Sequence, residues 1–199
     1  MIKKKIFFFF LIFLINQKIV FAETYKIIAI INNEAVTNQD IKNEIEVIKI
    51  LNKNKIDQKI IFTKALQSII EEKIKYQEII NYKKDIDNEK TNRFYKIFLQ
   101  NSNLDENQLN VKYSEILKKK IKIDYNWNEL IRDKYSWKIN INMHEVEKKI
   151  KKFEKNEKNK SLSEIKNKLL EEEKLKKLKV FEKYHLNRLK QKSHIVIYK

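Results

Sequence analysis

The stretch that decides the fold is YKIIAIINNEAVTNQDI, residues 25–41. Its residues 27–31, IIAII, are apolar on both faces of an extended chain, which is typical of a short strand covered on both sides. Asn32 and Asn33 follow, and asparagine tolerates the left-handed conformation that a tight turn requires. The apolar pair at 35–36 then suits a return strand. The stretch therefore predicts a β-hairpin.

Helices are predicted after the hairpin. Thr37 can accept a hydrogen bond from a free backbone N–H, and Asp40 in the first turn faces the positive end of the helix dipole. Apolar residues recur at three- and four-residue steps through most of the remaining chain, as amphipathic helices require. We expect helices at about 38–51, 57–82, 88–100, 102–117, 120–136, 142–153 and 161–191. Within the second of these, we expect Phe62, Leu66, Ile69, Ile70 and Ile74 to form the buried face.

The last residues, 193–198, form a second β-like run. Two isolated strand regions at opposite ends of a helical chain need partners for their backbone groups, and they can supply them to each other. The chain ends should therefore meet. The predicted fold class is mainly α, with a small β element made by the N-terminal hairpin and the C-terminal strand.

Composition excludes several kinds of chemistry. Glycine, proline and cysteine are all absent from the 199 residues, which rules out glycine-rich phosphate loops, disulfides, thiol nucleophiles and cysteine zinc sites. His144, His185 and His194 lie far apart and lack metal-ligand spacing. Acid pairs such as Glu71 and Glu72 suit a solvated helix face. We expect no enzyme activity, no cofactor and no metal.

The N-terminus indicates export. Lysines at 3–5 precede an unbroken apolar run at 6–15, and the small residue Ala22 suits a signal peptidase. We interpret residues 1–22 as a cleaved secretory signal, with an uncleaved membrane anchor as the alternative. With the signal cleaved, the mature protein would be periplasmic.

The formal net charge is +17, which would ordinarily suggest a nucleic acid or an anionic membrane as partner. The basic residues are spread among many acids, so heavy lysine use from an A/T-rich genome is the favoured explanation of the charge. An exported chain meets little nucleic acid. We therefore expect no nucleic acid partner and, at most, a weak contact with anionic membrane. A cytoplasmic nucleic-acid binder stays an alternative if the N-terminal segment is not an export signal.

Residues 28–37, with the Asp40-Ile41 pair, resemble the opening of the N-terminal domain of SurA-like periplasmic chaperones. The short starts at 102–105 and 142–146 resemble helix starts of the same family. The resemblance covers about 25–154 and, more loosely, 161–198.

The resemblance implies three segments after the signal. They are a helical N-terminal domain at 23–154, a linker at 155–160 in place of the family's parvulin-type isomerase domains, and a C-terminal helix and strand at 161–199 that pack back on the same core. Six linker residues cannot form a domain, so no isomerase activity is carried over.

The family implies a holdase that binds unfolded outer-membrane or secreted proteins in an apolar groove. The alternative is a structural or adaptor protein of the envelope that docks to a partner or to anionic membrane. Tyr125, Trp127, Tyr135 and Trp137 cluster in a short polar stretch and are the candidate client-binding residues, because large rigid rings bind apolar chain segments at low entropic cost. Core packing is the favoured interpretation for each single ring, although we expect some of the cluster to line a groove.

Overall fold

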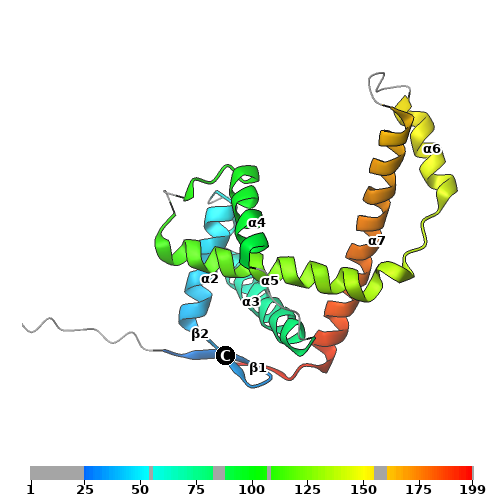
Figure 1. The fold of residues 1–199 in the computed structure, drawn as a ribbon. Coiled ribbons are helices and arrows are strands. Elements are labelled where there is room, and N and C mark those ends of the chain that lie inside the picture. The colour runs from blue at the N-terminus through cyan, green and yellow to red at the C-terminus, as the bar shows by residue number, and fades with distance from the viewer. Residues whose placement is uncertain (1–24, 54–55, 83–87, 107–108, 155–160, 199) are drawn as a thin grey trace, which may run out of the picture.

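The computed structural model describes residues 25–53, 56–82, 88–106, 109–154 and 161–198. In this part of the chain, six α-helices and a three-stranded antiparallel sheet form the fold (Figure 1). The predicted fold class, mainly helical with a small β element from both chain ends, is confirmed. The signal predicted at 1–22 and the linker predicted at 155–160 lie outside the described residues.

The sheet joins the two ends of the chain. Strand β1, Ile27–Ile31, lies between β2, Glu34–Thr37, and β3, Ile195–Ile197, and pairs antiparallel with both. The predicted turn is present, since Asn32 adopts a φ of 54°. The same residue accepts a hydrogen bond at its side-chain oxygen from the backbone N–H of His194, at 2.9 Å. The turn thus holds the C-terminal strand in place.

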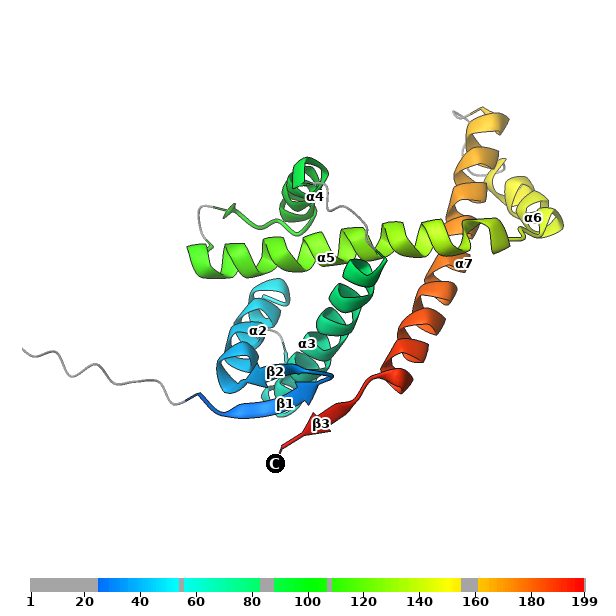
Figure 2. The same cartoon turned by 60° about the horizontal axis from the view of Figure 1, so that its bottom comes forward.

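The expectation that β1 is covered on both faces holds only in part. Ala29 and Ile31 are fully buried against the helices, whereas Ile28 and Ile30, which alternate with them, are only partly buried, and Ile27 at the start of the strand is 46% exposed. The sheet is too small to cover β1 completely. Its three short strands have helices against one face and leave the end of β1 open to solvent (Figure 2).

The helices follow the predicted order with one exception. Their bounds are α2, Asn38–Leu51; α3, Gln58–Asn81; α4, Asn88–Asn101; α5, Val111–Tyr135; α6, Met143–Glu154; and α7, Leu162–Lys192. Thr37 caps α2 and Ser161 caps α7, each in a reciprocal capping box. Among the described residues, no helix is both long enough and apolar enough to cross a membrane.

The two helices predicted at 102–117 and 120–136 are one helix, α5. No helix begins at Ser102, because Asn103 adopts a φ of 51°, outside the right-handed helical region. Instead Asn110 caps α5, and its side-chain oxygen accepts a hydrogen bond from the N–H of Lys112 at 2.9 Å. The helix continues through the three lysines at 118–120, since lysine is a good helix former.

Helix α5 forms the axis of the molecule. Helix α4 lies on one side of it, α2 and α3 lie on the other, and α7 crosses near its C-terminal end (Figure 2). The largest core lies between the sheet, α3, α5 and α7. A second core joins α2, α4 and α5, and a third joins α6 to the first half of α7, away from the rest (Figure 1).

One residue of the predicted face of α3 is misplaced. Phe62 is 47% exposed, and its neighbour Ile61 is buried in its stead. Adjacent helical residues point about 100° apart, and here Ile61 points toward the core while Phe62 points toward solvent. Leu66, Ile69 and Ile74 are buried as predicted, and Ile70 is partly buried against the same core.

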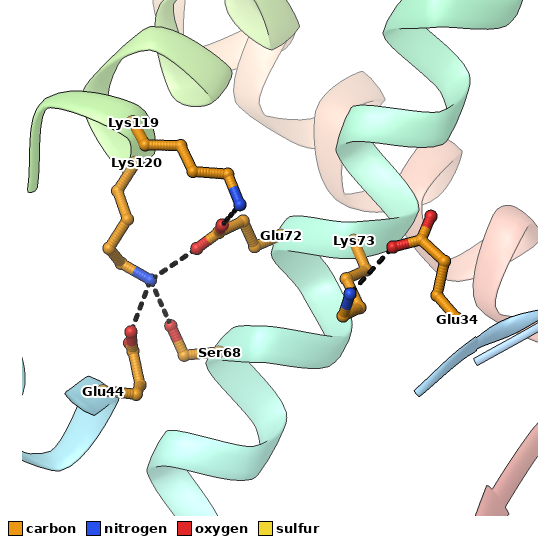
Figure 3. Close-up of polar contacts among 7 residues, drawn as sticks. All are labelled: Glu34, Glu44, Ser68, Glu72, Lys73, Lys119 and Lys120. Atoms are coloured by element: carbon orange, nitrogen blue, oxygen red, sulfur yellow. Dashed lines mark hydrogen bonds and ion pairs between the residues drawn. The ribbon is translucent and has the colours of Figure 1, made fainter. Parts of the chain in front are cut away.

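An ionic cluster ties α2, α3 and α5 together (Figure 3). Lys120 of α5 donates from its Nζ to the carboxylates of Glu44 and Glu72, both at 2.9 Å, and to the Ser68 hydroxyl at 3.2 Å. Glu44 is only 4% exposed. Burial alone would lower the pKa of Lys120, but Glu72 and Glu44 outweigh it and raise that pKa above its ordinary value. The cluster therefore fixes α5, from which the candidate site is built.

Candidate functional site

A groove opens between α4, α5 and α7, with a volume of about 600 Å³. This is within the range of roughly 300–1,000 Å³ that is common for binding pockets. The apolar residues that line it are Phe94 and Phe98 from α4, Ile121, Tyr125 and Ile131 from α5, and Leu175 and Leu178 from α7. We name this hollow the α4–α5–α7 groove.

The α4 wall is aromatic because this helix carries two apolar stripes. Tyr95 and Leu99 face the second core and are buried. Phe94 and Phe98, also four residues apart, lie on the neighbouring face and line the groove. Phe94 is 44% exposed, and its ring centroid is 4.6 Å from that of Tyr125. The two rings form an accessible aromatic wall.

The α7 wall is aliphatic. Leu178 is buried at the base, whereas Leu175, one turn earlier, is 48% exposed. Exposed Leu175 and Phe94 line the same hollow as the half-buried rings of Phe98 and Tyr125, and together they make an apolar surface. Such a surface favours a binding site for apolar chain segments.

The rim of the groove is polar but not basic. Three acids and two bases line it, in contrast to the net charge of +17 on the whole chain. Asp124 pairs with Lys75 at 2.7 Å, and Glu129 pairs with Arg132 at 3.2 Å. The charges of the rim are therefore largely balanced, so the groove suits an apolar ligand better than a phosphate.

The four aromatic residues predicted to bind a client lie in three different settings. Tyr125 lines the groove, whereas Trp127 is fully buried and Tyr135 is 8% exposed, both in the main core. Trp137 lies in η2, the short helical turn Ser136–Lys138, is 76% exposed and donates from Nε1 to the backbone oxygen of Lys134. Of the four, the structure brings Tyr125 alone into the groove.

Buried Trp127 does not line the groove, but it holds one of the rim residues in place. Its Nε1–H donates to the carboxylate of Glu182 at 3.0 Å, and Glu182 is a rim residue on α7. This bond crosses from α5 to α7 and fixes one edge of the groove. Trp127 is therefore a positioning residue for the site.

Sequence reasoning missed the groove residues of α4 and α7. The spacing of Phe94 and Phe98 predicts one apolar side of their helix, but it leaves out the second stripe at Tyr95 and Leu99. That doubled pattern is the sequence signal for a helix with one face in the core and one at a binding surface. The sequence around Leu175 shows no such doubled pattern.

A buried polar joint lies where α3, α5 and α7 meet. The Tyr135 hydroxyl is 2.8 Å from Nδ1 of His185, and Nε2 of His185 is 3.0 Å from Glu78. Lys134 pairs with the same carboxylate at 2.6 Å. Burial lowers the pKa of His185, although its bond to Glu78 opposes the shift. A neutral ring fits both bonds, donating from Nε2 to Glu78 and accepting at Nδ1 from the Tyr135 hydroxyl.

The hydrogen bonds from Tyr135 through His185 to Glu78 run in the order of a catalytic acid–base relay. The central ring, that of His185, is not accessible to a substrate, however. His185 has 0% exposed surface, so a substrate cannot touch its ring. The joint instead holds α7 against α5, and so holds the two walls of the groove together. Burial alone would raise the pKa of Glu78, but hydrogen bonds from Lys134 and His185 lower it, so this carboxylate stays ionised.

Across the described ranges, no group of three or more His, Cys, Asp and Glu side chains could hold a metal ion. Comparison with models of known protein families and with curated proteins gave no match for this chain. The resemblance to SurA-like chaperones therefore stays a prediction that rests on its own residues.

Proposed function

We propose that this protein is a holdase of the cell envelope that binds apolar segments of unfolded polypeptides in the α4–α5–α7 groove. The observation that carries the proposal is an open, aromatic and aliphatic groove with a charge-balanced rim on a strongly basic protein. The clients are unfolded outer-membrane or secreted proteins, and no isomerase step is involved. The periplasmic location follows from the N-terminal sequence and the SurA-like resemblance.

The groove suits weak and reversible binding. Phe94 and Leu175 are each about half exposed before any client binds, so a client gains only their remaining apolar surface. The gain is of the order of 1 kcal/mol per side chain, and ordering the client opposes it. A client can therefore leave without ATP when its own fold forms.

The test is suppression of aggregation of an unfolded outer-membrane protein by the chain from Glu23 onward, without ATP. We expect protection near equal molar ratio in the wild type. We expect the double variant Phe94→Ala with Tyr125→Ala to lose most of it while keeping its helical circular dichroism. No protection by the well-folded wild type would overturn the proposal.

A matched control separates the groove from general stickiness. Phe62 on α3 is 47% exposed, close to the 44% of Phe94, but does not line the groove. Phe62→Ala should protect like the wild type. Equal loss in Phe62→Ala and Phe94→Ala would mean that scattered exposed rings, rather than the groove, hold the client.

The second candidate is an adaptor that docks one folded envelope partner in the same groove. The crossing of α7 near the C-terminal end of α5 favours it, because the main core holds these two helices together as one surface (Figure 2). The two functions differ in the number of different proteins that the groove binds. A holdase protects several unrelated unfolded proteins, whereas an adaptor protects none and copurifies with a single native one.

A further inference from the structure

The outer face of α7 lies opposite the side that the helix buries. Val180 is 68% exposed and Tyr184 is 60% exposed, one turn apart on this face. Lys179 and Lys183 flank them, and with Asn187 these residues line a shallow open hollow. We name these five residues the outer face of α7.

The charge of α7 is strongly divided along its length. From Leu162 to Glu173 it has two lysines and four glutamates, a net charge of −2. From Lys174 to Lys192 it has seven lysines and one arginine against a single acid, Glu182, a net charge of +7. Much of the positive excess of the chain therefore lies in the second part of one helix, the part that carries the outer face.

The two lysines of the outer face are available to a partner. Lys179 and Lys183 are exposed, and neither forms an ion pair with any acid in the part of the chain that the structure describes. Lys190, by contrast, is held by Glu71 at 2.6 Å. Positive charge beside an exposed aromatic and an exposed aliphatic side chain thus remains uncompensated.

We propose that the outer face of α7 docks on an anionic lipid surface. Lysine ammonium groups attract anionic headgroups, and their methylene stems can lie along apolar surface. Tyrosine is enriched where the membrane meets water, because its ring is apolar and its hydroxyl is polar. Val180 and Tyr184 would enter the headgroup boundary while Lys179 and Lys183 contact phosphates. Lys179 also lines the rim of the α4–α5–α7 groove, whereas the other four residues of the outer face do not.

Other occupants fit the face less well. A second copy of this chain would bring the same +7 segment against itself, which like-charge repulsion opposes. A nucleic acid would use the lysines but gain nothing from Val180 and Tyr184. A lipid surface uses both and needs no closely matching shape, which suits a shallow, open helix face.

The test is cosedimentation of the chain from Glu23 onward with vesicles of phosphatidylcholine, with and without phosphatidylglycerol. This chain contains every residue of the three cores. We expect binding to the anionic vesicles alone, weakened by salt. The double variant Lys179→Ser with Lys183→Ser should weaken vesicle binding roughly 30-fold, because each lysine near the membrane surface contributes about 1 kcal/mol.

Two variants make the test specific. Lys166→Ser with Lys168→Ser removes two exposed lysines from the first part of the same helix and should leave binding within about twofold of wild type. Val180→Ser with Tyr184→Ser should weaken vesicle binding several-fold but leave binding to a short DNA duplex unchanged. Equal loss in both lysine pairs, or vesicle binding unaffected by the apolar pair, would overturn the proposal. The first result would indicate net charge alone, and the second an electrostatic partner such as nucleic acid.

Discussion

The two sides of α5 have opposite characters although they share one sequence. The inner side carries Trp127, Leu130 and Tyr135, which are between 0% and 8% exposed and belong to the main core. The other side carries Tyr125 and Arg132, which line the open groove. Aromatic rings that are neighbours in sequence thus have two different roles, core packing and lining the groove, because a helix turns about 100° per residue. Stability should depend on the inner side and binding on the groove side.

The largest loss of stability should come from Trp127→Ala. Trp127 is fully buried, and its truncation leaves a cavity in the main core and an unpaired carboxylate at Glu182. We expect the free energy of unfolding to fall by about 3–5 kcal/mol. Urea denaturation followed by circular dichroism measures it. A loss as small as that of Tyr125→Ala would remove the distinction between the two sides.

The next largest effect should come from Lys120→Met. This change leaves the buried carboxylate of Glu44 without its cation, since Lys120 is its ion-pair partner at 2.9 Å. We expect a loss of about 3 kcal/mol. Lys118→Met is the matched control, because its pair with Glu106 is exposed on both sides and should contribute less than about 1 kcal/mol. Similar losses in both variants would show that the cluster in Figure 3 does not fix α5.

The buried joint predicts a smaller, pH-dependent effect. The pKa of His185 is lowered in the fold, so its stabilising contribution is present above the ordinary value of 6.5 and is lost as the pH falls through the folded pKa. Glu78 has a lowered pKa too, so its contribution is lost only below 4.5. Between pH 6.5 and 4.5 the wild type should lose melting temperature with acidification, and His185→Gln should lose less.

Parallel slopes for the wild type and His185→Gln in that window would mean that the ring is not buried as a neutral group. The groups that face it are Tyr135 and Lys134 from α5, Glu78 from α3 and Arg188 from α7. The two cations oppose protonation and the carboxylate favours it. Burial acts with the two cations to lower the pKa of the ring, so the direction of the slope reports whether these effects outweigh the carboxylate of Glu78.

The sequence predicted the elements of this fold well because their signals are local. The Asn32 turn, the Thr37 cap and the apolar periods of most helices depend on residues close in the chain. An apolar groove was expected from the resemblance, but most residues that line it could not be predicted, because Phe94 and Leu175 come to the same hollow only through the packing of α4, α5 and α7. Tyr125 was the one candidate ring placed there, and its exposure depends on which side of α5 the core takes.

A small change in stability, but a large change in binding, should come from Phe94→Ala. The ring is 44% exposed, so its truncation removes only part of its burial and should cost about 1 kcal/mol or less. Aggregation suppression should weaken clearly, because the ring forms the α4 wall beside Tyr125. Trp137→Ala, at 76% exposure and outside the groove, should change neither quantity. If Trp137→Ala weakened suppression more than Phe94→Ala, the client site would lie at the end of α5 and not between its neighbours.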